Sequence, residues 1–535
     1  MVKVLVADKL AEEGLRRLRE ANGVEFDVRV GLSEGELAAA IGGYDGLIIR
    51  SGVKVTRKVL SSPGRLQAIA RAGVGVDNVD LDAATHAGIL VMNTPDANTI
   101  ATAEHTIALM LALARQIPRA CQHVKSGQWN RSQFMGTQLA DKTLGVVGLG
   151  RIGRAVAARA LGFNMNVLAY DPFYQSETAL EGRVKLVGAI EELVAVSDYL
   201  TLHAVLSDQT RGMINRAVLD KAKPGIRIIN CARGELVDEA ALAAAIVEGR
   251  VAGAAVDVFS SEPPTENPLV GLEQVLCTPH LGASTREAQS AVSVEAVELM
   301  LDYLLNGHIH AAVNVTGLRT PISHRDRIYV DLTRRMSAIL SRMCTAGVGD
   351  VNITINGASL EPLAATLGRH LLTELLRPHL GTAINLINAE TIAADRGIKV
   401  RLTSVRKGED FTDNITLAVR SGAELHSIEG TVFVDNLPRV LAIDGYRMDM
   451  VPEGHMIIIR NDDQPGVIGL VGTLMGNQRV NIADMTVSRQ KETALIVLKI
   501  DDPPPPSVLE ELEARKPPIR CVRTVSLSPV ERNQH

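Results

Sequence analysis

A glycine-rich turn between two apolar runs constrains the fold of this chain more strongly than any other feature. The run "TLGVV" is followed by "GLGRIG", a helix-like stretch and a second apolar run, "NVLAY", which ends at Asp171. This order is typical of a dinucleotide-binding βαβ unit, in which a G-x-G-x-x-G turn joins the first strand to the helix and an acid ends the second strand about 20 residues further on. The glycines let the backbone approach a pyrophosphate, and the helix N-terminus offers it unpaired N–H groups. The motif predicts a cofactor site at Gly148, Gly150, Arg151, Ile152 and Gly153.

The acid after the second run indicates which dinucleotide binds. A carboxylate at this position hydrogen-bonds the ribose 2′-hydroxyl of NAD, whereas it would repel the 2′-phosphate of NADP. We therefore expect NAD as the cofactor, with Asp171 at its ribose. The alternative interpretation of the motif is a plain βα turn without a ligand.

The 535 residues are too many for one hydrophobic core and indicate about three or four domains. Over the first 91 residues, short apolar runs alternate with helix-like stretches, the pattern of a parallel α/β sheet. A second α/β unit contains the glycine motif and continues through "YLTLHAV", "IRIINCARG", "VAGAAVDVF" and "QVLCTPH". A helix from about Ser284 to Leu305 is long enough to return to the first unit. We expect a Rossmann-like doubly wound parallel sheet (99–283) inserted in a flavodoxin-like α/β domain (1–98 and 284–315).

Beyond about Val315 the pattern changes twice. The stretch "RTPISHRDR" (319–327) has the composition of a linker, and helices then mix with strands such as "NITLAVRS", "GTVFVDN" and "VLAIDGYRMDM". From His455 the order strand, helix, strand, strand, helix, strand predicts a small βαββαβ domain of the ferredoxin-like class. The chain should therefore end in an α/β intervening domain (316–451) and a ferredoxin-like domain (452–535).

Composition argues against several classes of partner. A net charge of −5 without a basic stripe gives little support for nucleic-acid binding, and no segment approaches the roughly 20 apolar residues of a membrane span. The N-terminal "MVKVLVADKL" has no charged leader, so we expect a cytoplasmic protein. Five scattered cysteines without C-x-x-C predict free thiols. The histidines of "HIH" (308–310) lack a nearby third ligand, so we expect a surface turn and no metal.

Three residues follow later strands of the second unit: Arg233, Glu262 and His280. Taken singly, they can be a solvated strand end, a loop carboxylate and a histidine beside a helix. Together they supply what the oxidation of a 2-hydroxy acid needs. Arginine can bind the substrate carboxylate, histidine can accept the hydroxyl proton near neutral pH, and glutamate can orient the histidine. Open α/β sheets bind ligands beyond the carboxyl ends of their strands, where all three are expected.

Four motifs in this order, "GLGRIG", "NCARGELVDE", "GAAVDVFSSEPP" and "TPHLGAST", resemble those of the D-isomer-specific 2-hydroxyacid dehydrogenase family. The stretches "RAGVGVDNVDLDAATHAGILVMNTP" and "AEHTIALMLALARQIP", with two C-terminal domains, are similar to its long-form phosphoglycerate dehydrogenase branch. The resemblance implies NAD-dependent oxidation of 3-phosphoglycerate in serine biosynthesis, by a homotetramer regulated by L-serine. Two alternatives are a glyoxylate or hydroxypyruvate reductase and a nucleotide-sensing corepressor on the same fold.

The resemblance also implies roles for individual residues. His280 would be the acid–base, Glu262 its hydrogen-bonded partner, and Arg233 the clamp on the carboxylate and C2 oxygen. Further cofactor contacts would come from Ala204, Cys231, Ala232 and Asp257. The substrate would meet backbone N–H groups at Gly73, Val74 and Gly75, with Arg50, Arg71 and Arg131 as candidates for its phosphate. Val205 stands where many members have proline, a departure that bears on the rigidity of its loop.

The last domain resembles the ACT regulatory module. The marks of that module are Pro465-Gly466 at the first helix and Asn481-Ile482 at the second strand. In serine-regulated relatives the effector lies between two such domains, which implies effector contacts at Asn461, Asp463 and Asn481. Asn461 departs from the histidine or tyrosine familiar at its position.

Overall fold

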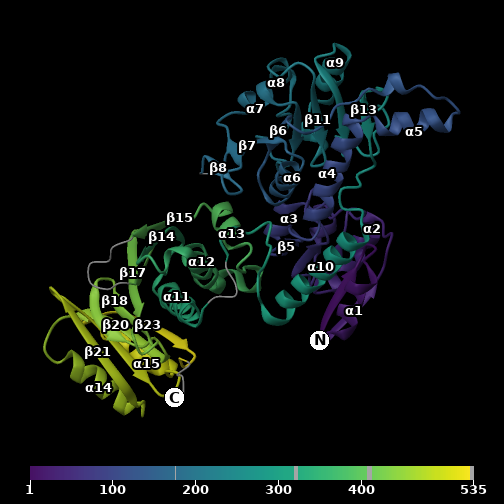
Figure 1. Ribbon diagram of the computed structural model, residues 1–535. Helices are drawn as coiled ribbons and strands as arrows, with labels where there is room; N and C mark the ends of the chain where they lie inside the picture. The colour runs from purple at the N-terminus through teal and green to yellow at the C-terminus, as the bar shows by residue number, and fades with distance from the viewer. Residues whose placement is uncertain (175, 319–322, 406–412, 531–535) are drawn as a thin grey trace.

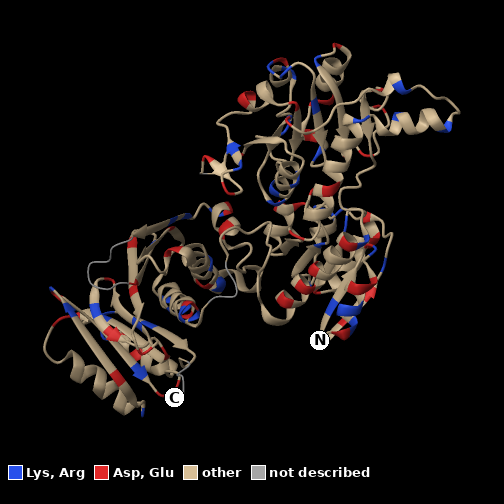
Figure 2. Ribbon diagram, viewed as in Figure 1, with Lys and Arg blue, Asp and Glu red and all other residues tan. Residues whose placement is uncertain are grey.

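The computed structural model describes residues 1–174, 176–318, 323–405 and 413–530. Within these ranges the chain forms four sheets, each with its own helices, and Figure 1 shows the last two sheets together at the end of the molecule away from the second. Lys and Arg residues are interspersed with Asp and Glu over all four parts (Figure 2). Among the described residues, every helix is too short or too polar to cross a bilayer.

The first sheet is parallel, with the strand order β2-β1-β3-β4-β5 that the flavodoxin-like prediction requires. Its strands are β1 (Val2–Val6), β2 (Val24–Val28), β3 (Gly46–Ile49), β4 (Ala68–Arg71) and β5 (Leu90–Asn93), and its helices are α1 (Glu12–Glu20), α2 (Glu34–Ala40) and α3 (Leu81–His86). The long helix α10 (Arg286–Asn306) returns to this sheet, where its Val292, Val297 and Met300 pack against Val4 and Val6.

The second sheet carries the glycine motif. Its order is β13-β12-β11-β10-β6-β7-β9-β8, parallel except for the pair β8 and β9, so the direction of strand addition reverses beside β6. The strands are β6 (Thr143–Val147), β7 (Asn166–Tyr170), β8 (Thr178–Ala179), β9 (Val184–Leu186), β10 (Tyr199–Leu202), β11 (Ile226–Asn230), β12 (Val251–Val256) and β13 (Val275–Cys277). The helices are α4 (Thr99–Ala114), α5 (Ile117–Lys125), α6 (Arg151–Gly162), α7 (Ile190–Val196), α8 (Arg216–Asp220) and α9 (Glu239–Val247). The Rossmann-like prediction is confirmed.

The two α/β units are interleaved along the chain. Strand β5 is part of the first sheet and helix α10 packs on it, whereas all strands of the second sheet lie between these two elements in the sequence. We therefore propose to keep the predicted boundaries, with 99–283 inserted between 1–98 and 284–315, followed by 316–451 and 452–535.

The third sheet has the order β15-β14-β16-β17-β18-β19. Its strands are β14 (Val348–Asn356), β15 (Lys399–Val405), β16 (Asn414–Ser421), β17 (Glu424–Val432), β18 (Pro438–Ile443) and β19 (Tyr446–Met450), with helices α11 (His324–Met343), α12 (Ala364–Leu380) and α13 (Ala389–Asp395). The expectation of one strand through "VLAIDGYRMDM" is wrong, because Asp444 and Gly445 have positive φ and form a hairpin turn between β18 and β19.

The expected linker at 319–327 is also wrong where it can be tested. Residues 319–322 lie outside the described residues, but α11 already begins at His324. The Ser323 side chain accepts a hydrogen bond from the Asp326 N–H, and the Asp326 carboxylate accepts one from the Ser323 N–H, which is a capping box. The charged "HRDR" segment is therefore the first turn of a helix.

The fourth sheet is antiparallel, in the order β21-β22-β20-β23, with the βαββαβ connectivity predicted from the sequence. Its elements are β20 (Gly454–Asp462), α14 (Val467–Asn477), β21 (Ile482–Gln490), β22 (Thr493–Ile500), α15 (Pro506–Ala514) and β23 (Ile519–Leu527). Its open face packs on the third domain, since Met456 and Val497 share a core with Leu332. The buried Arg335 of α11 donates hydrogen bonds to the carbonyls of Pro452 and Ser528, so the two C-terminal domains are joined through one core.

Candidate active site

Three predicted site residues lie at one edge of the second sheet. Strands β11, β12 and β13 are adjacent and parallel, and Arg233, Asp257 and His280 follow them in turn. Arg233 is not in the strand itself: it precedes the short 3-10 helix Gly234–Leu236 and is 27% exposed. These three side chains therefore lie together at the carboxyl edge of the sheet, as the sequence predicts.

The predicted acid–base pair is present. The Nδ1 atom of His280 lies 2.9 Å from a carboxylate oxygen of Glu262, whose other oxygen accepts the Phe259 N–H at 3.2 Å. Both side chains are about half exposed. Because Nδ1 donates to the carboxylate, Nε2 is the ring nitrogen that can face a ligand.

The backbone at His280 is held in an unusual conformation by Asp257. His280 has φ +56°, and its N–H donates to the Asp257 carbonyl at 2.8 Å. The fully buried Asp257 carboxylate accepts the N–H groups of Leu281 at 2.7 Å and Gly282 at 2.8 Å. Burial raises the pKa of Asp257, but hydrogen bonds from His105 and Thr278 outweigh it and lower that pKa below its ordinary value. Asp257 thus anchors the His280 loop, and its predicted contact with the nicotinamide stays a prediction.

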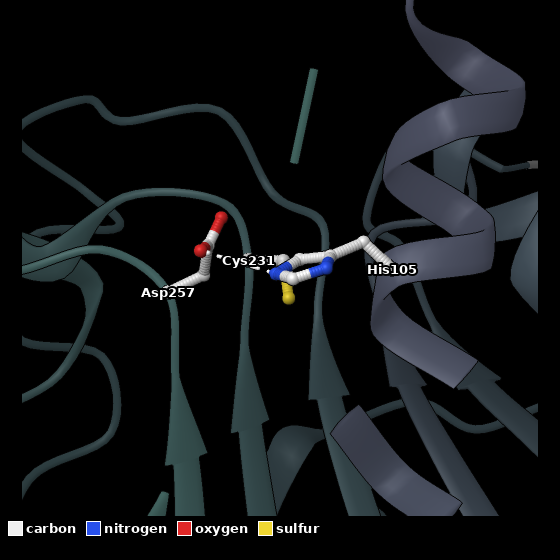
Figure 3. Close-up of side chains that lie close together, drawn as sticks. All are labelled: His105, Cys231 and Asp257. Carbon is white, nitrogen blue, oxygen red and sulfur yellow. Dashed lines mark hydrogen bonds and ion pairs between the residues drawn. The ribbon is translucent and has the colours of Figure 1, made fainter. Parts of the chain in front are cut away.

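His105, which is not among the predicted site residues, reaches this site from α4. Its Nε2 lies 3.1 Å from the Asp257 carboxylate, and Cys231 lies beside both (Figure 3). Burial raises the pKa of the Cys231 thiol to about 12, so the thiol stays protonated at neutral pH. The Asp257 carboxylate thus accepts hydrogen bonds from His105 and Thr278 as well as from the His280 loop, and these contacts connect α4 to the edge of the second sheet.

The substrate-binding candidates converge on the turn after β4. A Cβ on Gly75 would overlap the Arg233 guanidinium, and one on Gly73, which has φ +145°, would overlap that of Arg71. Only glycine leaves both guanidinium groups room beside this turn. The Nε of Arg233 donates a hydrogen bond to the Asp77 carboxylate at 2.9 Å. Like the contact of His105 with Asp257, this one is not indicated by the sequence.

Positive charge is concentrated at this turn. Burial, followed by repulsion from Arg233 and a smaller contribution from Arg50, lowers the pKa of Arg71 to about 10, so Arg71 is still charged at neutral pH. The Nε atoms of Arg50 and Arg71 are buried without a hydrogen-bond partner among the described residues. The unpaired donors and mutual repulsion fit an anionic ligand.

Two other substrate candidates have different surroundings. The carbonyl of Val74 accepts a hydrogen bond from the Asn93 side chain at 2.6 Å, which fixes the turn. Arg131 begins the short 3-10 helix Arg131–Phe134 that follows α5, and its guanidinium lies 5.8 Å from the centre of the Trp129 ring. Its predicted phosphate contact remains a prediction.

The glycine motif has the shape that a pyrophosphate requires. A Cβ on Gly153 would overlap the Gly148 carbonyl, so this glycine lets α6 pack against the turn, whereas the space beside Gly150 is open. Gly148 has φ +88°, and its Cβ would lie 2.8 Å from the Ala204 nitrogen. Gly150 caps α6, whose first residue Arg151 pairs with Asp96. These residues fit a dinucleotide, with Ile152 in the first turn behind them.

The Asp171 carboxylate is fixed at the end of β7. One oxygen accepts the Leu149 N–H at 2.8 Å and the other accepts the Phe173 N–H at 2.9 Å.

The loop after β10 contains Val205 where many members have proline. Val205 is 75% exposed, and its carbonyl accepts the Thr210 hydroxyl at 2.7 Å, so a local hydrogen bond stabilises the loop that lacks proline.

Replacing Asp171 with serine should shift cofactor preference toward NADPH. The substitution removes the charge that repels a 2′-phosphate and the acceptor for the 2′-hydroxyl. We expect NADH affinity to fall and NADPH affinity to rise, as measured by fluorescence titration of both, with Asp435→Ser, which changes an exposed carboxylate of the third domain, as the control. An unmutated protein that prefers NADPH would contradict the role of Asp171.

The predicted effector residues do not converge within one chain. By strand register, Asn461 and Asp462 lie opposite Ala494 and Thr493, whereas Ile482, next to Asn481, lies opposite Ile500 at the other end of the sheet. Seven residues of strand separate the two ends by about 20 Å. A single ligand could touch both sets only if a second copy of the domain supplied one of them.

The polar groups at these positions already have contacts. The Asp463 carboxylate pairs with Arg489 of β21 at 2.6 Å, and the Asn481 side chain donates to Asp501 at 2.7 Å. Asn461 is 2% exposed, and its side-chain oxygen has no hydrogen-bond partner among the described residues. A ligand at Asp463 would therefore compete with Arg489.

The expectation that "HIH" lacks a third ligand is wrong. Asp302 of α10 lies 3.0 Å from Nδ1 of His308 and 3.1 Å from Nε2 of His310. The helix brings the carboxylate back to the two histidines, a proximity that the six- and eight-residue separations alone did not reveal.

Comparison with known protein families matches three parts of the chain. Residues 107–282 match the NAD binding domain of D-isomer specific 2-hydroxyacid dehydrogenases, 327–444 the D-3-phosphoglycerate dehydrogenase intervening domain, and 455–516 the ACT domain. The D-3-phosphoglycerate dehydrogenase of Archaeoglobus fulgidus is 42% identical over 516 residues, 96% of this chain and 97% of its own. That of Methanocaldococcus jannaschii is 40% identical, covering 98% of this chain and all of its own. This chain belongs to the D-3-phosphoglycerate dehydrogenase family.

Solved structures match the dehydrogenase half of this family member. The TT0316 protein of Thermus thermophilus is 37% identical with a TM-score of 0.53, covering 58% of this chain and 99% of its own. A glyoxylate reductase of Paecilomyes thermophila is 30% identical with a TM-score of 0.54, covering 58% and 98%. The family membership confirms an NAD-dependent oxidoreductase, and the match to the ACT domain confirms the resemblance of the C-terminal domain.

Proposed function

We propose that this D-3-phosphoglycerate dehydrogenase family member oxidises 3-phosphoglycerate to 3-phosphohydroxypyruvate with NAD, the first step of phosphorylated L-serine biosynthesis. The observation that carries the proposal is the cluster of Arg50, Arg71 and Arg233 beside the Gly73–Gly75 turn. A substrate with both a carboxylate and a phosphate suits more guanidinium groups than a simple 2-hydroxy acid would need.

The residues divide the chemical step among them. Arg233 holds the substrate carboxylate and C2 oxygen, and Nε2 of His280 accepts the C2 hydroxyl proton as the carbonyl forms. Glu262 on Nδ1 stabilises the resulting imidazolium. NAD, when bound, supplies the acceptor for the hydride that leaves C2. In the reverse direction His280 returns the proton to the oxygen.

The phosphate assignment predicts a selective effect of Arg71→Gln. Because Arg71 should contact only the phosphate, kcat/KM for 3-phosphohydroxypyruvate should fall at least about tenfold, while that for unphosphorylated hydroxypyruvate should barely change. Steady-state rates with NADH measure both, and Arg57→Gln, an exposed arginine on the same domain, is the control. Equal losses for the two substrates would contradict the assignment.

Two other functions make different predictions for the same assay. A glyoxylate or hydroxypyruvate reductase would use the unphosphorylated ketoacids at least as well. A nucleotide-sensing corepressor would bind NADH without appreciable turnover. The intervening and ACT domains, which lie beyond the matched part of the glyoxylate reductase, favour the phosphoglycerate dehydrogenase function.

We also propose that L-serine inhibits by binding between ACT domains of two chains, in a homotetramer of a cytoplasmic protein. Asn461 and Asp463 of one chain would meet Asn481 of another, since one chain holds them at opposite ends of its sheet. The ammonium group would displace Arg489 from Asp463. The shared core of the last two domains, together with Asn385 of the third domain bonded to the Gly88 carbonyl at 2.8 Å, links this site to the substrate domain.

Asp463→Ala should weaken serine binding at least about tenfold, because the ammonium loses its carboxylate. Equilibrium dialysis with labelled serine and inhibition of the rate measure binding and coupling, the latter worth about 1–3 kcal/mol in ordinary allostery. Asp435→Ala on the third domain is the control. Inhibition that is unchanged in Asp463→Ala would place serine elsewhere.

A further inference from the structure

A cluster of metal-ligating side chains lies at the end of α10, outside the proposed active site. It consists of Asp302 on the last turn of the helix and His308 and His310 in the segment that follows. One carboxylate oxygen lies 3.0 Å from Nδ1 of His308, and the other lies 3.1 Å from Nε2 of His310. Together the three residues offer two imidazole nitrogens and a carboxylate at one point.

The geometry is close to that of a bound transition metal. The potential ligand atoms all lie within 4.8 Å of one another. Ligands of a tetrahedral zinc, at about 2.0–2.2 Å from the metal, lie about 3.4 Å apart, so the side chains need to move only slightly. The two imidazole rings stand at 78° with centroids 6.2 Å apart, which lets each direct a nitrogen at a shared point without stacking on the other.

A neighbouring amide orients the Asp302 carboxylate as a possible metal ligand. The Asn306 amide donates to one carboxylate oxygen at 2.8 Å and fixes its orientation. Such outer hydrogen bonds orient metal ligands in known sites.

Exposure leaves room for the ion and for water. The Asp302, His308 and His310 side chains are 31%, 42% and 38% exposed, so a metal can enter and a water can complete its coordination. Two imidazoles with one carboxylate suit zinc and similar ions, whereas magnesium and calcium prefer oxygen ligands. On binding, each imidazole would carry its proton on the nitrogen remote from the metal.

We propose that Asp302, His308 and His310 form a binding site for a divalent transition metal ion of the zinc class. The ion would fasten the end of α10 to the segment that then passes along β5, where Ala312 bridges Met92 and the Val313 N–H donates to the Val91 carbonyl. That segment leads from the substrate domain to the third domain. The site is independent of the proposed function.

Cobalt and zinc binding to the full chain test the site. The protein is prepared without a histidine tag, freed of metal with a chelator, titrated with Co²⁺ while its visible spectrum is recorded, and dialysed against Zn²⁺. We expect one ion per chain and visible cobalt bands of a nitrogen and oxygen site, without the near-ultraviolet thiolate band that Cys231 would give. Asp302→Asn and the double variant His308→Asn/His310→Asn should each weaken binding at least about tenfold.

His86→Asn is the matched control, because His86 is an exposed histidine 3.3 Å from one carboxylate, Asp395, with no second imidazole in that pair. It should bind metal as the unmutated chain does. Circular dichroism shows whether each variant is folded. Because Asp302→Asn hardly changes the side-chain volume, this variant alone can test the site if the double variant does not fold. Absence of binding by the unmutated chain, a thiolate band, or stoichiometry and affinity unchanged in Asp302→Asn would overturn the proposal.

Discussion

The His280→Asn variant is expected to lose about 10²–10⁴-fold in kcat while binding NADH normally, because a positioned general base contributes about that factor. Asparagine retains a polar side chain of similar reach but cannot accept the C2 proton. Its amide can still donate to Glu262, which now lies 2.9 Å from Nδ1 of His280. The loss should therefore appear in the chemical step, measured in single-turnover experiments with 3-phosphohydroxypyruvate and NADH.

Two further variants separate chemistry from structure. His455→Asn changes a partly buried histidine of the ACT domain, whose Nδ1 lies 2.8 Å from the Ser526 hydroxyl, and should keep full activity. Glu262→Gln should lose less than His280→Asn, since it removes the stabilising charge and leaves the base. Turnover of His280→Asn within a few-fold of the unmutated rate would remove His280 from the proposed mechanism.

Replacing Arg233 with glutamine should lower kcat/KM by about 30-fold to several thousandfold, corresponding to the 2–5 kcal/mol typical of a partly buried charged hydrogen-bond partner. One guanidinium nitrogen donates a hydrogen bond to the Ala232 carbonyl at 2.6 Å, and another donates to Asp77. These two contacts orient the guanidinium group toward the turn at Gly75. Arg233→Lys should recover only part of the loss, because lysine keeps the charge but not the planar pair of donors.

Cofactor binding should not depend on Arg233. NADH affinity measured by fluorescence should stay close to normal, and Arg16→Gln, which alters a surface ion pair on α1, should leave the kinetics unchanged. A Gln variant with normal kcat/KM for the ketoacid would show that another group holds the substrate carboxylate.

Much of the dehydrogenase half was predictable because its signals are local. The glycine motif with Asp171 defines a βαβ unit, and the polar residues after β11, β12 and β13 meet at one edge because parallel strands end together. The S-x-x-D pattern of Ser323 and Asp326 also indicates a capping box, although the charge and the proline of the surrounding stretch favour a linker.

Contacts between distant segments could not be predicted in the same way. His105 meets Asp257 across 152 residues, and Arg233 meets Asp77 across 156. Nothing in the spacing of either pair indicates the contact, which depends on how α4 and the first sheet pack on the second. Likewise, only strand register shows that Asn481 and Asp463 lie at opposite ends of the ACT sheet.

Reduction of three ketoacids by NADH tests whether the arginine cluster selects a phosphorylated substrate. We expect the unmutated chain to reduce 3-phosphohydroxypyruvate with a kcat/KM on the order of 10²-fold or more above that for hydroxypyruvate or glyoxylate, because an unphosphorylated substrate leaves the Arg50 and Arg71 guanidinium groups unpaired. Equal or faster reduction of hydroxypyruvate or glyoxylate, or no reduction of 3-phosphohydroxypyruvate, would contradict it.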